Sequence, residues 1–341
     1  MNLSGKKIII FGGTGSLGRA LVRRLSSDNE LILFSRDEAK HWTIKNQLGA
    51  NNSVKFVVGD IRDEVRVKET MIRHNPDAVI IASALKQVDT CELSPQESVQ
   101  TNILGIRSVL NAVTHQAHLL SALDAVLLVS TDKACAPANV YGMCKAIAER
   151  LVTSTCIAMD KGPRFIGVRY GNVLESRGSI IPLFRHQGEF QSSFTVTHPE
   201  MTRFIMTLDQ SIDLIVSTIL GAHSGEMWLP KLKSMKIMDL AEIFSKRYDK
   251  PIDIIGIRPG EKLHEDLISR PESVRVRDEK GFYKMSPSHT DVALDAKIFD
   301  YASDQDVLPK QELAAYLEEL EIFTRSMDQF LGREIEEIKT S

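Results

Sequence analysis

The protein has 341 residues, with 42 Lys and Arg against 45 Asp and Glu and a formal net charge of −3. This near balance argues against a nucleic-acid or polybasic membrane partner, because both need a clustered excess of Lys and Arg. No stretch approaches about 18 consecutive apolar residues, and the apolar run that ends at Phe11 is too short for a secretory signal. We therefore expect a cytoplasmic protein without a membrane segment. The four cysteines form no CxxC pair, so we expect free thiols and no metal site.

Short apolar runs alternate with longer amphipathic stretches along the first 170 residues. Runs rich in Ile, Val and Leu, bounded by Gly, Asp or Ser, are typical of buried strands in a parallel sheet. Strands are predicted over Lys7–Phe11, Leu31–Phe34, Val54–Val58, Ala78–Ala82, Ala125–Val129 and Phe165–Arg169. Helices are predicted between them over Leu17–Ser26, Val99–His115 and Val140–Met159. This alternation predicts an α/β fold with a Rossmann-like, doubly wound parallel sheet.

Prolines recur beyond residue 170 and break the chain into shorter pieces, which predicts a smaller α+β lobe sharing a cleft with the first. Helices are predicted there over Leu208–Gly221 and Ile237–Lys246. In Pro309–Leu331, apolar residues spaced three and four apart predict an amphipathic helix, with Pro309 tolerated in its first turn. This helix either packs on its own core or forms a subunit contact.

A glycine-rich turn follows the first predicted strand directly and opens a helix. Its GxxGxxG pattern suits a tight turn, close approach of the backbone to a pyrophosphate, and close packing of helix on strand. The helix N-terminus adds N–H groups and a positive dipole end. The pattern therefore predicts a dinucleotide site. The predicted contact residues in this turn are Gly12, Thr14, Gly15, Ser16, Leu17 and Gly18.

The end of the second predicted strand bears on the choice between NAD and NADP. There Ser35 and Arg36 are followed by Asp37 and, one turn on, by Lys40. A hydroxyl and two cations suit a 2′-phosphate, so NADP is favoured over NAD, although Asp37 could instead serve a ribose hydroxyl. Asp60, after the third strand, either meets the adenine or caps the following helix. Further cofactor contacts are predicted at Ile61, Ala82, Ala84, Lys86 and Asn102.

A tyrosine and a lysine stand four residues apart on the helix predicted after the fifth strand. Tyr141 and Lys145 therefore share one helix face. An ammonium beside a phenol favours the phenolate, which makes Tyr141 a candidate base near neutral pH. A YxxxK pair alone is common by chance. When the pair follows a later strand of a sheet whose first strand leads into GxxGxxG, it is typical of a short-chain dehydrogenase/reductase site. Such a site binds its cofactor through the same Tyr and Lys.

The string Ser130-Thr131-Asp132-Lys133-Ala134 lies shortly before Tyr141 and discriminates between subgroups of this class of enzyme. The chain resembles, to about residue 290, the extended short-chain dehydrogenase/reductase family, and the Asp-Lys pair of this string points to a subgroup of it. Within that family it is similar to the UDP-N-acetylglucosamine 4,6-dehydratases that invert C5 at the start of pseudaminic acid synthesis. The other stretches that carry the resemblance are Leu85-Lys86, Thr101–Gly105, Arg169–Val173, Ser176–Ser179, Ile181–Phe184, Met201–Phe204 and Arg258–Glu265.

The resemblance implies a lyase that removes water across C5 and C6 of a UDP-sugar after oxidising C4. It assigns Tyr141 to the O4 proton, Lys145 to holding the phenolate and the ribose, and Thr131 to the same substrate oxygen. Lys133 would abstract the C5 proton. Asp132 would have to be protonated to help the C6 hydroxyl leave, which requires a raised pKa. The NADP would be recycled, with no net redox change.

The resemblance also divides the chain by role. Residues 1–170 would form the NADP-binding Rossmann domain, with later segments returning to it. Residues 171–290 would form the UDP-sugar lobe, and residues 291–341 a helical extension. A homo-oligomer is expected, with a hexamer as one arrangement. The residues predicted to contact UDP-N-acetylglucosamine or a close UDP-sugar are Lys86, Asn172, Arg177, Arg203, Arg258 and Glu261.

Two alternatives stay open. Many inverting members read Tyr-Gly-Ala-Thr-Lys, whereas here Met143 and Cys144 precede the lysine. This departure leaves a retaining dehydratase or a UDP-sugar 4-epimerase as the second hypothesis. The third is a non-catalytic, NADP-sensing regulator of the same fold. The membrane-anchored dehydratases of this group have long N-terminal extensions that this sequence does not show, so we expect the soluble branch.

Overall fold

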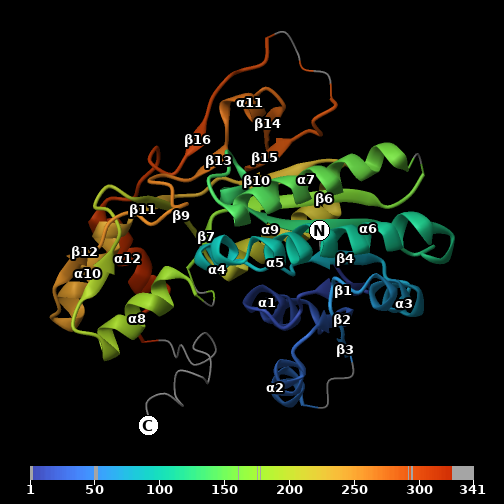
Figure 1. The fold of residues 1–341 in the computed structure, drawn as a ribbon, viewed down its shortest axis with the longest axis horizontal. Coiled ribbons are helices and arrows are strands. Elements are labelled where there is room, and N and C mark those ends of the chain that lie inside the picture. Colours follow the sequence, from blue (N-terminus) through green and yellow to red (C-terminus); the bar gives the residue numbers. More distant parts are fainter. Residues whose placement is uncertain are drawn as a thin grey trace. The chain divides into compact units, whose positions relative to one another are not determined.

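The computed structural model describes residues 3–49, 53–159, 161–174, 176, 178–290, 292 and 295–324. The chain divides into two compact units, whose elements Figure 1 labels. The first unit consists of Met1–Tyr170, Asp209–Lys231 and Leu267–Asp300, and the second of Gly171–Leu208, Leu232–Asp266 and Tyr301–Ser341. Each unit is therefore built from separate stretches of the sequence.

A nine-stranded sheet of order β14-β15-β10-β6-β5-β4-β1-β2-β3 forms the centre of the first unit. Every neighbouring pair from β10 to β3 is parallel, whereas β15 pairs antiparallel with both β10 and β14. The order 3-2-1-4-5-6 is that of a doubly wound nucleotide-binding sheet. The strands are β1 (Lys7–Phe11), β2 (Glu30–Ser35), β3 (Val54–Val58), β4 (Ala78–Ile81), β5 (Ala125–Thr131), β6 (Arg164–Tyr170), β10 (Met227–Pro230), β14 (Val276–Glu279) and β15 (Phe282–Met285).

The predicted α/β class and all six predicted strands are confirmed, with ends that agree within two residues. The largest difference is at β5, which continues through Ser130 and Thr131. These two residues pair in register with Arg169 and Tyr170 of β6. The pairing brings the polar end of β5 to the carboxyl edge of the sheet, where ligand sites form in open α/β folds.

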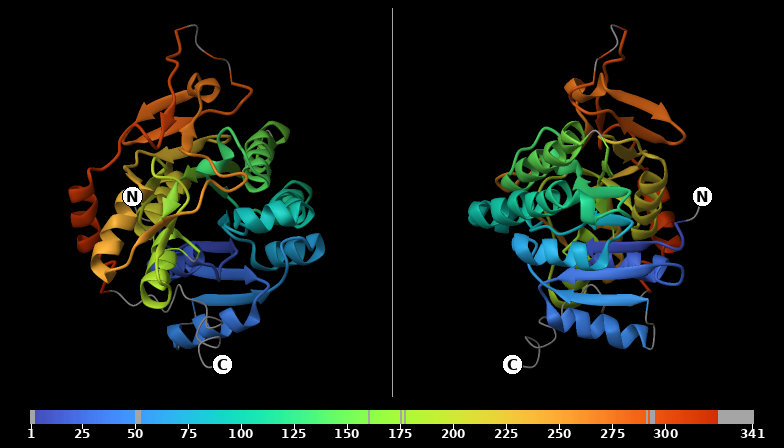
Figure 2. Two further views of the ribbon diagram at one scale, coloured as in Figure 1. Left: turned by 60° about the vertical axis from the view of Figure 1, so that its left-hand side comes forward. Right: turned by 90° about the vertical axis from the view of Figure 1, so that its right-hand side faces the viewer.

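Helices cover both faces of this sheet. On one face α3 packs on α6, and α6 on α7, over a core of fully buried strand residues such as Phe11, Val79 and Leu128. Figure 2 shows these helices together on one side of the sheet, with α9 on the other side. The α-helices of this unit are α1 (Ser16–Leu25), α2 (Glu38–Leu48), α3 (Glu64–His74), α4 (Val88–Leu93), α5 (Pro95–Val99), α6 (Gly105–His115), α7 (Val140–Ala158), α9 (Leu208–Gly221) and α11 (Arg270–Ser273).

The helix predicted over Val99–His115 is not continuous. A π-helical turn, η1 (Gln100–Leu104), separates α5 from α6. Asn102 lies in this turn and is fully buried. Its side-chain oxygen accepts from Leu85 N at 2.8 Å, and its amide donates to Leu85 O at 2.8 Å. The π turn thus fixes the loop that follows β4. Two 3₁₀ turns, η2 (Ala117–Leu119) and η3 (Asp132–Ala134), complete the unit.

The second unit has an aromatic core. Phe194 on β8 meets Phe184 of α8 at 5.6 Å and Phe244 of α10 at 6.0 Å between ring centroids, both edge-on. Such edge-to-face pairs stabilise a small core beyond their area of burial. The elements are β7 (Asn172–Val173), α8 (Ile180–Phe190), β8 (Phe194–Val196), β9 (Thr202–Met206), β11 (Ser234–Lys236), α10 (Ile237–Tyr248), β12 (Ile252–Ile254), β16 (Tyr301–Ala302) and α12 (Lys310–Glu319). Strand β13 (Asp266–Ile268) begins at the last residue of a second-unit stretch and continues into the first unit.

The last predicted helix is shorter than its apolar pattern suggests. The helix α12 ends at Glu319, and Glu321 has a left-handed φ of 54°. Leu313 and Leu317 are fully buried, and Phe323 lies 5.0 Å from Phe244 of α10. The apolar face therefore packs on the core of its own unit, and residues 325–331 of the predicted helix lie outside the described residues. No helix in the part of the chain that the structure describes is long and apolar enough to cross a membrane.

Candidate active site

The glycine-rich turn leaves no room for side chains at two of its positions. Gly12 has a φ of 84°, and a Cβ there would stand 2.7 Å from Ser83 N. A Cβ at Gly18 would stand 2.2 Å from the carbonyl oxygen of Gly13, so helix α1 packs directly on the turn. Gly15 is the N-cap of α1 and has no side chain to occupy the helix terminus. The turn and the helix N-terminus therefore form a cradle that fits a pyrophosphate.

A chain of hydrogen bonds links this turn to the end of β2. The hydroxyl oxygens of Thr14 and Ser35 are 3.0 Å apart, and Ser35 Oγ is 3.0 Å from His41 Nε2. His41 is buried, and its Nδ1 has no hydrogen-bond partner among the described residues. Burial lowers the pKa of His41, although Asp37 and Glu38 act in the opposite direction. These contacts tie the Ser35 hydroxyl between the glycine-rich turn and α2.

The charged residues after β2 are paired with carboxylates. Asp37 is the N-cap of α2: it accepts from Lys40 N at 3.0 Å and also forms an ion pair with Lys40 Nζ. Arg36 Nη1 lies 3.6 Å from Asp60 Oδ2. Asp60 also accepts from the backbone and side chain of Arg62. The cap of α3 is Asp63, so the helix-cap interpretation of Asp60 is wrong.

The remaining predicted cofactor residues lie around the ends of β3 and β4. Ile61 is buried. Ala82 is half-buried, and the N–H of Ala82 donates to Phe11 O at 2.9 Å. Ala84 and Lys86 are exposed in the loop after β4. Asn102 braces this loop from behind through the bonds to Leu85. These two hydrogen bonds satisfy the buried amide of Asn102, so no ligand is needed to explain why the side chain is buried.

The end of β5 and the first turns of α7 bring five predicted catalytic residues into one unit. Asp132 is fully buried in η3, and its Oδ1 accepts from Thr131 Oγ1 at 2.9 Å and from Lys133 Nζ at 3.1 Å. Its Oδ2 is buried without a hydrogen-bond partner among the described residues. Such an orphaned oxygen is costly unless a ligand or water meets it.

Tyr141 and Lys145 are both buried on α7. Burial lowers the pKa of Lys145 to about 8, against the opposing charges of Glu149 and Cys144. Its ammonium donates to Val129 O at 2.6 Å. Burial, and then the negative charge of Asp132, raise the pKa of the Tyr141 phenol, while its contact with Thr131 acts in the opposite direction. Burial therefore sets the direction of the shift in the pKa of Tyr141.

The predicted substrate residues other than Lys86 belong to the second unit. Arg203 is buried, and its guanidinium donates to three backbone carbonyls, those of Thr202, Leu263 and Lys262, at 2.7, 3.1 and 3.0 Å. Asn172 lies on β7, and its Oδ1 is buried without a partner among the described residues. The exposed residue Arg258 donates its backbone N–H to Glu261 at 3.2 Å, and Arg177 lies outside the described residues.

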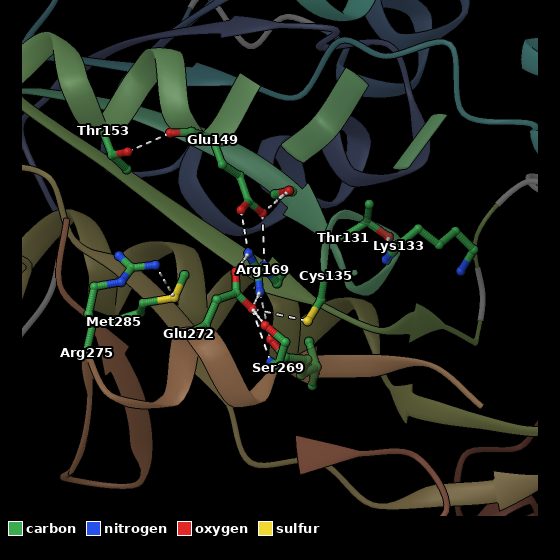
Figure 3. Close-up of polar contacts among 12 residues, drawn as sticks. Thr131, Lys133, Cys135, Glu149, Thr153, Arg169, Ser269, Glu272, Arg275 and Met285 are labelled. Carbon is green, nitrogen blue, oxygen red and sulfur yellow. Dashed lines mark hydrogen bonds and ion pairs between the residues drawn. The ribbon is translucent and has the colours of Figure 1, made fainter. Parts of the chain in front are cut away.

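Sequence reasoning missed a buried ion cluster next to the turn that carries Thr131, Asp132 and Lys133. Arg169 of β6 lies between Glu149 of α7 and Glu272 of α11, with Nη2–Oε distances of 2.5 and 2.7 Å (Figure 3). Tyr141, Lys145 and Glu149 are spaced four apart, so helical periodicity could have placed Glu149 on the catalytic face. No local signal connects Glu272, more than a hundred residues away from Arg169.

Fold and site together define an extended short-chain dehydrogenase/reductase: a doubly wound sheet, a glycine cradle after β1, and Tyr141 and Lys145 on the helix after β5. Residues 8–287 match the family of polysaccharide biosynthesis proteins, and the chain belongs to this family. Within the extended class its likeness is to the nucleotide-sugar dehydratases and epimerases described next.

Known relatives agree on this class and differ in their activity. The chain is 36% identical to a UDP-N-acetylglucosamine 4,6-dehydratase (inverting) of Campylobacter jejuni, over 88% of this chain and 86% of the relative. It is 37% identical to a UDP-glucose 4-epimerase of Rickettsia prowazekii, over 87% and 85% of the two chains. The crystal structure of Pen from Bacillus thuringiensis superimposes with a TM-score of 0.87 at 32% identity, covering 95% of this chain and 100% of that one.

Proposed function

We propose that the protein is a UDP-N-acetylglucosamine 4,6-dehydratase that inverts C5, as the Campylobacter relative is named. The observation that carries this proposal is the contact of Asp132 with Lys133 at the end of β5. A 4-epimerase needs only to remove and return hydrogen at C4. Elimination of water needs, in addition, a base for the C5 proton and an acid for the C6 hydroxyl, and this pair supplies both.

The cradle after β1 fits a nicotinamide dinucleotide, because Gly12 and Gly18 leave room for backbone and ligand but not for side chains. When bound, this cofactor accepts a hydride from C4 and returns it to C6. The exposed guanidinium of Arg36 beside Ser35 supports NADP over NAD, since a 2′-phosphate attracts a cation that a ribose hydroxyl does not need. The first unit would thus be the cofactor domain.

The chain's own groups would handle the protons. Tyr141 takes the O4 proton, with Thr131 bonded to the same oxygen. Because burial raises the pKa of Tyr141, the ammonium of Lys145 is needed nearby to favour the phenolate. A Lys133 ammonium directs one proton at the Asp132 carboxylate in a hydrogen bond of 3.1 Å. Its transfer to the carboxylate leaves an amine that can remove the C5 proton and an acid that can protonate the C6 hydroxyl.

The overall reaction then balances as the loss of one water molecule. The C5 proton leaves to Lys133, and the C6 hydroxyl leaves with the proton of Asp132. Tyr141 then releases the O4 proton to solvent, and solvent supplies a proton to C5 from the opposite face, which gives the L-configured 4-keto sugar. The second unit would bind the UDP group through Asn172, Arg258 and Glu261, together with Arg177, whose position lies outside the described residues. Arg203, whose donors are held by backbone carbonyls, would shape the loop rather than contact phosphate.

The test is incubation of the purified protein with UDP-N-acetylglucosamine and NADP⁺ in D₂O, followed by proton NMR. A dehydratase removes the 6-hydroxyl, gives a C6 methyl group and places deuterium at C5, and nuclear Overhauser contacts between the C6 methyl group and the ring protons report the configuration at C5. A product that keeps its 6-hydroxyl with an inverted C4 would support the second candidate, a UDP-sugar 4-epimerase, which the Rickettsia relative favours. Light scattering of the same sample tests the expected homo-oligomer.

If NADP⁺ binds but the sugar stays unchanged, the enzyme proposal fails for this substrate. Binding should be measured with NAD⁺ in parallel, because the two cofactors differ only in the 2′-phosphate. A higher affinity for NAD⁺ would contradict the choice of NADP.

A further inference from the structure

The turn that carries Thr131, Asp132 and Lys133 is attached to the same buried ion cluster at both of its ends. Ser130 precedes the turn, and its hydroxyl donates to Glu149 Oε1 at 2.5 Å. Cys135 follows the turn, and its thiol donates to Glu272 Oε2 at 3.2 Å. Both carboxylates are bound by Arg169. Figure 3 shows the three charged groups together, with Cys135 directed at Glu272.

The Arg169 guanidinium is fully used. Its Nε and Nη2 donate to the two oxygens of Glu149 at 3.0 and 2.5 Å, and its Nη1 and Nη2 donate to the two oxygens of Glu272 at 3.0 and 2.7 Å. Nη1 also donates to Leu267 O at 2.9 Å. These are five donors, the full complement of a guanidinium. A buried arginine in this state has a single geometry, because every alternative leaves a buried donor unpaired.

Glu272 and Arg169 hold each other in their charged forms. Burial would raise the pKa of Glu272, yet the charge and hydrogen bonds of Arg169 bring it down to about 2. Ser269 of the α11 capping box adds donors from its N–H at 3.1 Å and its hydroxyl at 2.8 Å. Glu272 therefore accepts from α11, β6 and the residue after the catalytic turn at the same time.

Helix α7 fixes the turn from a third side. A Cβ on Gly142 would stand 2.1 Å from Lys133 O, so the helix passes the turn at backbone distance, one residue after Tyr141. Within the turn, Cys135 N donates to Asp132 O at 2.9 Å, and Lys133 N approaches Thr131 Oγ1 at 3.4 Å. A displacement of either end of the turn would therefore move Asp132 and Lys133 together.

We propose that Arg169, Glu149 and Glu272 are positioning residues, which hold the Thr131–Lys133 turn against Tyr141 through Ser130 and Cys135. The role in turnover rests on the proposed dehydratase function, whereas the clamping of the turn does not. The cluster does not touch the reacting atoms. It sets the distance of the Asp132–Lys133 pair from the tyrosine, and errors of about 1 Å in such distances cost up to roughly a hundredfold in rate.

The test uses the two attachments, because removing Arg169 would leave buried carboxylates unpaired and could unfold the protein. Cys135→Ala and Ser130→Ala each remove one bond to the cluster and leave the ion pairs intact. Cys135→Ser keeps a donor. The matched controls are Cys156→Ala, whose thiol donates only to Thr153 O at 2.9 Å, and Ser108→Ala, whose buried hydroxyl bonds Leu104 O at 3.1 Å.

Two readouts are needed. Hydrogen exchange of the Lys133 and Cys135 amides should speed up roughly threefold to tenfold in Cys135→Ala and Ser130→Ala, as expected for the loss of one buried hydrogen bond. It should not change in the controls or in the rest of the sheet. In turnover, kcat should fall by a similar factor, with KM and NADP⁺ affinity within about twofold of the parent, and Cys135→Ser should recover most of the loss.

Unchanged exchange at these two amides would overturn the proposal, whatever the activity. The proposal would also fail if control variants with the same loss of melting temperature lost as much kcat as Cys135→Ala and Ser130→Ala. That result is expected of a purely structural cluster. If the parent protein does not convert UDP-N-acetylglucosamine, the proposed function fails, and the amide exchange still decides whether the cluster clamps the turn.

Discussion

The carboxyl ends of β2 and β5 both carry charged side chains, and they hold them in opposite ways. After β2, the side chain of Arg36 is 59% exposed and meets a carboxylate at 3.6 Å. Next to β5, the side chain of Arg169 is 2% exposed and all its donors are paired. Exposed pairs contribute about 0–1 kcal/mol, whereas breaking a buried pair costs about 3–5 kcal/mol. Arg36 after β2 can therefore exchange its partner for a ligand, whereas Arg169 beside β5 cannot.

The largest effect is expected at the Asp132–Lys133 pair. Lys133→Met should lower kcat about 10³-fold, because a general base contributes 10²–10⁴-fold, while NADP⁺ affinity stays unchanged. Steady-state turnover and fluorescence titration with NADP⁺ measure the two quantities. Lys161→Met, which changes an exposed lysine beyond α7, is the control. A loss of NADP⁺ binding in Lys133→Met would show that the residue serves the cofactor instead.

The second prediction concerns Lys145, whose pKa is lowered to about 8 by burial. Between pH 8 and about 10.4, the ordinary lysine pKa, the unfolded chain binds more protons at this site than the folded protein. The contribution of this site to stability should therefore rise with pH in that window, by up to about 3 kcal/mol. Urea unfolding of the parent and of Lys145→Met at pH 7.5 and 9.5 measures it.

The difference between the parent and Lys145→Met is the informative quantity, because Tyr141 titrates in both. The pKa of Tyr141 is raised in the folded protein, so its contribution falls above about pH 10, and the upper pH stays below that value. A difference that is flat between the two pH values would mean that Lys145 has an ordinary pKa in the folded protein.

A smaller effect is expected at the β2 end. Arg36→Ala should weaken NADP⁺ binding about tenfold and NAD⁺ binding no more than about twofold. A charge-assisted bond to phosphate contributes roughly 1.5–3 kcal/mol, and solvent screening reduces this contribution at an exposed site. Isothermal titration with both cofactors measures the ratio. Arg107→Ala, on the exposed side of α6, should change neither affinity. Equal losses for both cofactors would place Arg36 away from the 2′-position.

The smallest effect is expected when one local pair at the β2 end is opened. Asp37→Ser keeps a helix cap and removes the carboxylate that holds Lys40, so the preference for NADP⁺ over NAD⁺ should rise about threefold. Asp63→Ser is the matched control, since Asp63 caps α3 through Arg66 N in the same way. If the preference shifts toward NAD⁺, Lys40 does not contact the 2′-phosphate.

The sequence predicted those parts of the molecule that depend on local pattern. The strands follow from apolar runs, and the cradle from Gly12 and Gly18, where no side chain fits. The common face of Tyr141 and Lys145 follows from helical spacing. The buried ion cluster of Arg169, Glu149 and Glu272 was not predictable in the same way. Glu272 contacts Arg169 only because the segment Leu267–Asp300 belongs to the first unit. Neither composition nor local pattern indicates that this late segment packs there.

Two local predictions failed for physical reasons. The apolar spacing of Pro309–Leu331 continues past Glu319, but a left-handed residue at Glu321 turns Phe323 back onto α10. The pattern from Val99 to His115 is that of one helix, yet a π turn interrupts it around Asn102. Ile106 and Val109 of the first segment and Leu313 and Leu317 of the second are buried as expected, although the backbone around them departs from a regular helix.

The π turn has a consequence for how this chain can change over evolutionary time. A π turn holds one residue more per hydrogen-bonded turn than an α-helix, so it is the mark of a single-residue insertion that the helix has absorbed. Deleting one codon between Gln100 and Leu104 would restore a regular helix and rotate one flank by about 100° relative to the other, given 3.6 residues per turn. Asn102 would then lose its hold on Leu85, and the loop after β4 would be released. An insertion of this kind is simple to gain, and once a loop depends on it, it is difficult to lose.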